Sequence, residues 1–193
     1  MADGTKTDRR ILKTKAAINK AFLELFFEKD FDRITINDIS ERSNVNRGTV
    51  YLHYTDKYDL LDKCIDDHLN KMIHSCTFSK FAEKKVDIIE AIAALKSLFI
   101  YFEENFLFFS SMLSCQKTSF FRERMLQILR ATIQKKLDMQ GINQKMDKEL
   151  ITQFTASAFV GTVEWWIRNN MPHPPQFMAE QVWKLFERNN FHC

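Results

Sequence analysis

The sequence predicts an all-α protein with a small N-terminal helical domain and a larger C-terminal helical domain. Only 4 glycines and 3 prolines occur among 193 residues, whereas 18 residues are phenylalanine. So few turn-forming residues and so many long apolar ones argue against a β-sandwich or an α/β sheet and favour helices. A chain of this length also has enough residues to bury a sizeable core.

The first predicted helix covers residues 8–29. Its apolar residues fall on one helical stripe, and Thr7 or Asp8 can cap its start. We expect this stripe to cover the next two helices from behind. The stripe consists of Ile11, Ile18, Phe22, Leu25 and Phe26.

A helix-turn-helix is predicted over residues 35–54. Thr35 offers an N-cap oxygen to the first helix, and Asp38 stands in its first turn. Asn44 follows where a tight turn needs a residue that tolerates the left-handed conformation. Asn46 can then cap the second helix, which is too short to be stable alone.

A set of residues extends through the helix-turn-helix and into the helix after it: Asp38-Ile39, Val45, Gly48-Thr49, Tyr51, His53-Tyr54, Lys57 and Leu60-Leu61. Through these positions, residues 9–70 resemble the N-terminal signature of the TetR family of transcriptional regulators, in register and without an insertion. The resemblance includes the helices that flank the helix-turn-helix, so it is more specific than that pattern alone. The alternative is three short helices of an unrelated helical protein.

The second helix of this motif would enter a DNA major groove. Arg47 has the reach and the forked donors to bind a guanine edge or a phosphate. Gly48 permits close backbone approach, and Thr49 can contact a thymine methyl or a phosphate. The resemblance implies phosphate contacts for Tyr51, His53 and Lys57. We expect Val50 and Tyr54 in the core. The predicted DNA-binding residues are Thr35, Asn46, Arg47, Gly48, Thr49, Tyr51, His53 and Lys57.

Positive charge is concentrated at the start of the chain. The net charge is only +3, which is too small for a nonspecific nucleic-acid coat. Residues 1–20 nevertheless hold 6 basic side chains against 2 acidic ones. Such a basic arm suits phosphate contact, although a solvated helix start would have the same composition.

The predicted domains are a DNA-binding domain at 1–55, a connecting helix at 56–76 and a C-terminal regulatory and dimerisation domain at 77–193. A polar connection at 77–85 opens the last of these. The helices expected after it lie at 86–105, 106–113, 120–139, 147–169 and from 174 onward.

An effector pocket is predicted in the Phe- and Met-rich C-terminal domain, mainly because of the resemblance. Ligand sites are mostly apolar with a few placed polar groups. Aromatic residues at helical spacing belong to an ordinary core more often than to a pocket, and no cluster of His, Asp or Arg indicates a charged ligand. The candidate pocket residues are Phe99, Phe102, Phe106, Phe109, Met112, Met125 and Phe159.

The last two helices resemble the dimer-forming pair of the family, which makes a four-helix bundle across a twofold axis. Small residues in the middle of 147–169 would let a second helix come close. The alternative is a helical hairpin packed within one chain. The candidate interface residues are Phe154, Ala158, Gly161, Trp165, Val182, Trp183 and Phe186.

Several function classes are not supported by the sequence. No Ser/His/Asp or Cys/His arrangement, Gly-rich phosphate loop or metal-ligand cluster is recognisable, so we expect no enzyme activity, cofactor or metal. The 4 cysteines are scattered, which is typical of thiols in a reducing compartment. No apolar run could span a membrane, and the N-terminus lacks the apolar core of a secretory signal, so we expect a cytoplasmic protein.

We therefore expect a homodimeric DNA-binding repressor that binds an inverted-repeat operator and is released by a small, apolar effector. The alternative is a protein-binding adaptor of the same fold that no longer depends on DNA. The intact Arg47, Thr49, Tyr51 and Lys57 favour the DNA-binding interpretation.

Overall fold

In the computed structural model, all of the regular secondary structure in the described part of the chain is helical, which confirms the predicted all-α class. The polar connection predicted at 77–85 lies outside the described residues, as do Cys76, Cys115 and Cys193. The described residues are 4–75, 88–114, 119–137 and 139–188.

The chain divides into two compact units, here called the N-terminal unit (Met1–His68) and the C-terminal unit (Leu69–Cys193). The division falls inside α4 (Lys57–Ser75), within the stretch that the sequence predicts as a connecting helix. The N-terminal unit begins with α1 (Gly4–Glu28), η1 (Phe31–Arg33), α2 (Ile36–Ser43) and α3 (Arg47–His53).

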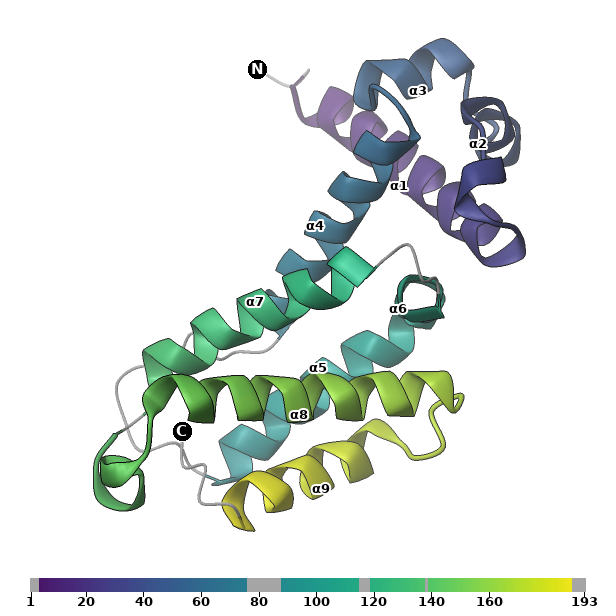
Figure 1. The fold of residues 1–193 in the computed structure, drawn as a ribbon. Helices are drawn as coiled ribbons and strands as arrows, with labels where there is room; N and C mark the ends of the chain where they lie inside the picture. Colours follow the sequence, from purple (N-terminus) through teal and green to yellow (C-terminus); the bar gives the residue numbers. More distant parts are fainter. Residues whose placement is uncertain (1–3, 76–87, 115–118, 138, 189–193) are drawn as a thin grey trace. The chain divides into compact units, whose positions relative to one another are not determined.

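One apolar core holds the N-terminal unit together. In Figure 1, α2 packs on α1, and α3 packs on α2. Ile18 and Phe22 of α1 are fully buried, as are Ile39 of α2 and Val50 of α3. Each buried side chain of this size stabilises the fold by about 1.5–3 kcal/mol. The inner side of α3 is therefore packed against the other helices of the unit, and its outer side faces away from them.

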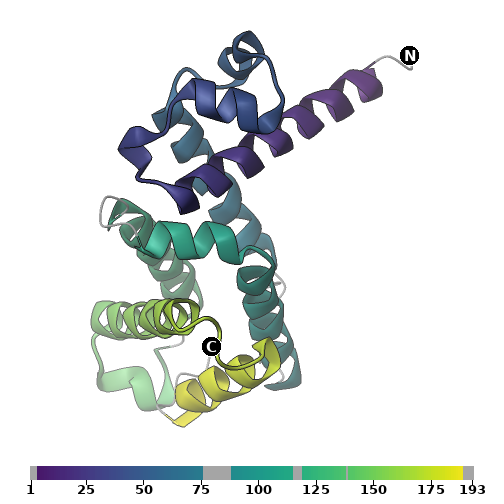
Figure 2. The same ribbon diagram turned by 90° about the vertical axis from the view of Figure 1, so that its right-hand side faces the viewer.

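The C-terminal unit is built from two pairs of packed helices and a short helix between them. In it, α5 packs on α9, α7 packs on α8, and α6 packs on α8 (Figures 1 and 2). Its elements are α5 (Ile88–Glu104), α6 (Phe106–Ser114), α7 (Ser119–Lys136), η4 (Gly141–Lys145), α8 (Lys148–Arg168) and α9 (Pro175–Arg188).

Aromatic side chains join these helices in the interior. The ring centroid of Phe99 on α5 lies 5.2 Å from that of Trp166 and 6.2 Å from that of Phe159, both on α8. Phe102 and Phe109 meet edge-on at 4.7 Å and join α5 to α6. Edge-to-face pairs of this kind add about 0.5–1.5 kcal/mol beyond the buried area.

The turn between α8 and α9 is closed by a buried tryptophan. The indole Nε1–H of Trp166 donates to the carbonyl oxygen of His173 at 2.8 Å. Asn170 and Met171 adopt left-handed conformations with φ of 56° and 53°. Pro175 is the first residue of α9, where the missing N–H of proline costs nothing.

None of the described helices combines the length and the apolar composition that a bilayer span requires.

Candidate nucleic-acid interface

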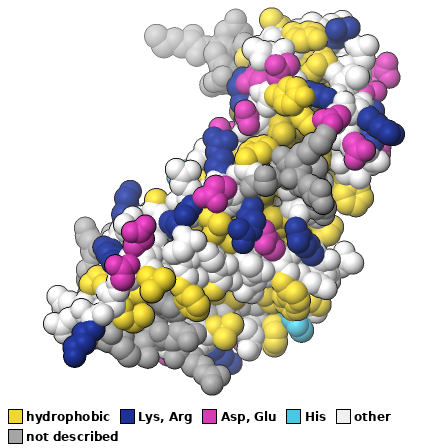
Figure 3. All heavy atoms as spheres, in the orientation of Figure 1, with side chains coloured by type: hydrophobic (Ala, Val, Ile, Leu, Met, Phe, Trp, Pro, Cys, Tyr) yellow, Lys and Arg dark blue, Asp and Glu magenta, His cyan; other side chains and the backbone are white. Residues whose placement is uncertain are grey.

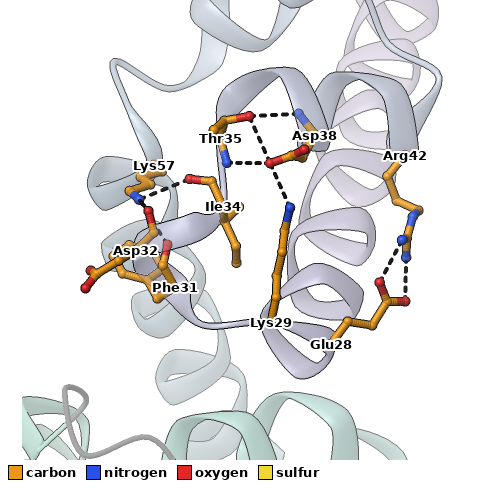
Figure 4. Close-up of polar contacts among 9 residues, drawn as sticks. All are labelled: Glu28, Lys29, Phe31, Asp32, Ile34, Thr35, Asp38, Arg42 and Lys57. Carbon is orange, nitrogen blue, oxygen red and sulfur yellow. Dashed lines mark hydrogen bonds and ion pairs between the residues drawn. The ribbon is translucent and has the colours of Figure 1, made fainter.

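The start of α2 is fixed by a reciprocal pair of hydrogen bonds between Thr35 and Asp38 (Figure 4). The backbone N–H of Asp38 donates to Thr35 Oγ1 at 3.2 Å, and that of Thr35 donates to Asp38 Oδ2 at 2.8 Å. This is the capping box that satisfies two amides at a helix start. The Thr35 hydroxyl also donates to Asp38, so Thr35 holds the start of α2, and its DNA contact stays a prediction.

Lys29 at the end of α1 strengthens this cap. Its Nζ lies 2.9 Å from Asp38 Oδ2. The bond from Lys29, followed by those from Thr35, lowers the pKa of Asp38 to about 2. Charge on Asp38 therefore stabilises both the first turn of α2 and its contact with α1.

A second ion pair joins α2 to α1. Arg42 donates from both terminal nitrogens to the two carboxylate oxygens of Glu28, each at 2.8 Å (Figure 4). The hydrogen bond from Arg42 lowers the pKa of Glu28. The two-pronged geometry is the specific one for an Arg–carboxylate pair, and it fixes the orientation of α2 on α1.

The turn between α2 and α3 has the predicted geometry. Asn44 has φ 52°, in the left-handed region. Ser40 Oγ donates to the carbonyl oxygen of Val45 at 2.8 Å, and the backbone N–H of Val45 donates to the carbonyl oxygen of Ser40 at 3.1 Å. Asn46 caps α3, since its Oδ1 accepts the backbone N–H of Gly48 at 2.8 Å. These bonds confirm Asn44 as the turn residue and Asn46 as the cap.

The α3 helix has one buried and one exposed side. Val50 and Tyr54 are buried, as predicted, and the Tyr54 hydroxyl donates to Asn19 Oδ1 at 3.0 Å. Burial raises the pKa of Tyr54 to about 12. Of the predicted DNA-binding residues, Thr49 and His53 are half-buried at the edges of the helix. The predicted DNA-binding residues on the exposed side of α3 are Arg47, Gly48 and Tyr51.

Arg47 and Tyr51 form a pair on the exposed side of α3. The guanidinium carbon of Arg47 lies 5.5 Å from the centroid of the Tyr51 ring. One terminal nitrogen of Arg47 donates to the Tyr51 hydroxyl at 3.3 Å. The stacked arrangement limits the conformations of the guanidinium while leaving its other donors for a nucleic acid.

Lys57 makes polar contacts within the N-terminal unit, and the phosphate contact implied by the resemblance stays a prediction. Its Nζ donates to the carbonyl oxygens of Phe31, Asp32 and Ile34 at 2.9, 2.9 and 3.0 Å (Figure 4). It also lies 4.8 Å from the centroid of the Phe31 ring. An ammonium group has three donor hydrogens, so these carbonyls use all of them. We therefore assign Lys57 to joining the start of α4 to the segment before α2.

The candidate effector residues gather in the interior of the C-terminal unit. Phe106 is half-buried at the first residue of α6, and the other six are buried. Ring contacts connect the phenylalanines of α5 to those of α6 and α8. Among the buried side chains described in this unit, none is charged. The hydroxyls of Ser111 and Thr155 are buried without a hydrogen-bond partner.

The candidate dimer residues separate into an exposed and a buried set. On α8, Phe154 is 58% exposed, Trp165 is 48% exposed, and Ala158 is also exposed. A Cβ added to Gly161 would meet nothing within 4 Å. Figure 3 shows hydrophobic side chains gathered along this helix.

The α9 candidates are largely enclosed within the protomer. Val182 and Trp183 are buried, since α9 packs on α5, and Phe186 is half-buried. Trp183 also lines a groove of about 540 Å³ together with Ile88 and Ile92 of α5. A side chain buried in its own protomer has little surface left for a partner. The exposed apolar residues of α9 are instead Phe177 and Leu185.

Two family models match the chain. Residues 18–64 match the model described as bacterial regulatory proteins, tetR family, and residues 90–188 match a transcriptional regulator C-terminal region. The chain belongs to the TetR family of bacterial regulatory proteins. Both matched regions are regulator regions, which bears out the expectation that this TetR-family chain is not an enzyme.

Individual relatives agree with this membership. The chain is 29% identical to the HTH-type transcriptional regulator YxbF of Bacillus subtilis, over 93% of its own length and 46% of YxbF. It thus spans about half the length of that relative. It is 26% identical to the probable acrEF/envCD operon repressor of Escherichia coli (strain K12), over 88% of this chain and 82% of the repressor.

A solved structure with a similar fold is that of the transcriptional regulator FadR from Bacillus subtilis, in complex with stearoyl-CoA. The TM-score is 0.65 at 18% identity, with 88% of this chain and 96% of FadR covered. This likeness shows the fold.

The sequence analysis missed two features of the candidate interface. The carbonyls that bind Lys57 come from residues more than 20 positions earlier, so no local pattern indicates them. Leu52 is 80% exposed on α3. Its position on the side of the helix opposite Val50 and Tyr54 was a signal that could have identified it.

Proposed function

We propose that the protein is a homodimeric DNA-binding transcriptional repressor that binds an inverted-repeat operator and is released by a small, apolar effector. The observation that carries this proposal is the exposed side of α3, which presents Arg47, Gly48 and Tyr51 outward from a capped helix-turn-helix. In this motif the second helix enters the major groove, where its side chains meet base edges.

The proposed contacts divide by chemistry into contacts with base edges and contacts with the DNA backbone. The Arg47 fork matches the N7 and O6 acceptors of guanine, and the exposed Gly48 lets the helix backbone approach the base edges. The Tyr51 hydroxyl suits a phosphate oxygen, as do the exposed Arg9 and Arg10 at the start of α1. Base contacts would set the sequence preference, and phosphate contacts would set the affinity and its salt dependence.

Dimerisation is supported by the exposed face of α8. Apolar side chains recur along it from Leu150 through Phe154 to Trp165, with the small Ala158 and Gly161 between the aromatic rings. A contiguous apolar face of this kind is typical of a protein interface. A twofold axis beside α8 would relate two copies of α3, which accounts for the expected inverted repeat.

An apolar effector suits the interior of the C-terminal unit. The buried side chains described there carry no charge, and they offer the hydroxyls of Ser111 and Thr155 as hydrogen-bonding groups without a partner. FadR holds stearoyl-CoA on the same fold, so this helical scaffold can take a ligand with a long apolar part. Repression is supported by the similarity to the probable acrEF/envCD operon repressor of Escherichia coli.

The test is selection of bound sequences from a random duplex pool with the full chain, followed by affinity measurements across a salt series. We expect an inverted repeat whose half-sites are about one helical turn apart or slightly more. Its affinity should exceed that of the unselected pool by at least about 10³-fold at physiological salt. Weak binding without sequence preference would overturn the proposal and favour a protein-binding adaptor.

A further inference from the structure

Leu52 is an exposed leucine on the recognition helix α3. At 80% exposure it exceeds every other large apolar side chain in the described part of the chain. Successive residues of a helix are about 100° apart, so Leu52 lies about 180° from the midpoint between the buried Val50 and Tyr54. Its side chain therefore points directly away from the core of the N-terminal unit.

The neighbours of Leu52 on α3 leave its side chain open to contact with a binding partner. Side chains on a helix lean toward its N-terminus and cover the preceding turn. The residue one turn before Leu52 is Gly48, which has no side chain to shield it. Arg47 and Tyr51 complete the exposed side, with the Arg47 guanidinium stacked on the Tyr51 ring. The exposed side that carries Leu52 thus also carries a cationic group suited to an anionic partner.

We propose that Leu52 is a specificity-determining residue that recognises the 5-methyl group of thymine in the major groove. This inference rests on the proposed function, since it requires α3 to enter DNA. Thymine is the base whose major-groove edge carries a methyl group. A leucine has no donor or acceptor for the other base edges, so contact with that methyl is the favourable interaction open to it in the groove.

The proposed contact has a predictable size. Removing one methyl group from water is worth about a fourfold change in affinity. Losing the contact in both half-sites of a dimer should therefore weaken binding about 15-fold, if the two half-sites contribute equally. Replacing thymine by deoxyuridine removes the methyl group and leaves every hydrogen-bonding group of the base pair in place.

The experiment uses the full-length protein and the duplex recovered by selection. Each thymine is replaced in turn by deoxyuridine, symmetrically in both half-sites, and the dissociation constant is measured for wild type and Leu52→Ala. We expect one symmetric position at which wild type loses about 15-fold in affinity and Leu52→Ala loses less than about twofold. The matched control is Leu12→Ala, an exposed leucine on α1, which should keep the full deoxyuridine effect.

Each outcome decides the inference. A wild-type protein that is indifferent to deoxyuridine at every thymine would overturn it, and so would a deoxyuridine effect that persists in Leu52→Ala. If Leu52→Ala binds too weakly to measure, Leu52→Met retains an apolar side chain and should keep the methyl preference. Failure to recover any preferred duplex would instead overturn the proposed function, so the two failures are distinguishable.

Discussion

At the scale of single residues, Lys57 illustrates how a charged side chain can serve the fold of a DNA-binding unit. Its ammonium binds three backbone carbonyls between Phe31 and Ile34, while its own position starts α4. These carbonyls belong to the segment from which α2 begins. The contact therefore links the position of the helix-turn-helix to that of α4.

Lys57→Met should lower the free energy of unfolding by about 1–3 kcal/mol, because it leaves three carbonyls without their charged donor. Urea unfolding followed by circular dichroism measures this loss. The matched control is Lys63→Met on the same helix, whose exposed ammonium pairs with Asp59 and donates to one carbonyl, that of His53, instead of three, so the loss should be smaller, less than about 1 kcal/mol.

The same variant separates the two roles that a lysine at this position can have. Because the Lys57 ammonium is occupied within the N-terminal unit, the slope of log affinity against log salt should stay at its wild-type value. A slope smaller by about one phosphate contact per protomer would assign Lys57 to the DNA backbone instead.

Asp38 makes the stability of the helix-turn-helix depend on pH. Its pKa is lowered from 3.8 to about 2, so below pH 4 the unfolded chain binds a proton that the folded chain does not. The stability contributed by Asp38 is therefore present above about pH 4 and is lost as the pH falls toward 2.

Asp38→Asn should lower the free energy of unfolding near neutral pH by about 1 kcal/mol, because it removes the charge that pairs with Lys29 and interacts with the first turn of α2. It should also flatten the decline in stability between pH 4 and 2. Urea unfolding at a series of pH values measures both effects. An unchanged pH dependence in the variant would show that the Asp38 cap does not contribute to acid sensitivity.

At the scale of elements, the caps were predictable from the sequence and the packed faces were less so. Thr35, Asn44 and Asn46 act on neighbours within a few residues, so local residue types were enough to identify their structural roles. Whether Val182 and Trp183 face α5 or a partner depends on the tertiary arrangement. The amphipathic pattern of α9 alone does not determine it.

The exposed face of α8 offers a selective test of dimerisation. Gly161→Leu should leave the protomer folded, because the added side chain meets no atom within 4 Å of its Cβ and leucine favours a helix over glycine. In a dimer the same side chain would stand between two closely packed helices. Sedimentation velocity should therefore show a monomer, and circular dichroism should show unchanged helicity.

The matched control for that variant is Gln127→Leu on the exposed side of α7, which should sediment as wild type does. A Gly161→Leu protein that remains dimeric would place the interface elsewhere. A variant that loses helicity would show that Gly161 is needed inside the protomer.

At the scale of the whole molecule, family membership was predictable because the signature around α2 and α3 is contiguous in sequence. The interior of the C-terminal unit was predictable only as an apolar cluster. Its residues come from α5, α6, α7 and α8, and the sequence does not show which of them would contact an effector and which only one another. An effector that changes operator affinity by about 5–150-fold would correspond to a coupling free energy of about 1–3 kcal/mol.

The measurement that tests the central claim most directly is parallel selection from a random duplex pool with wild type and Arg47→Ala. If the exposed side of α3 reads DNA, the variant should lose preference at one symmetric base pair per half-site, worth about 1–3 kcal/mol of discrimination, and keep the rest of the inverted repeat. Identical base preferences for the two proteins would contradict the assignment of Arg47, and the absence of an inverted repeat for wild type would contradict the account of α3 as the reading element.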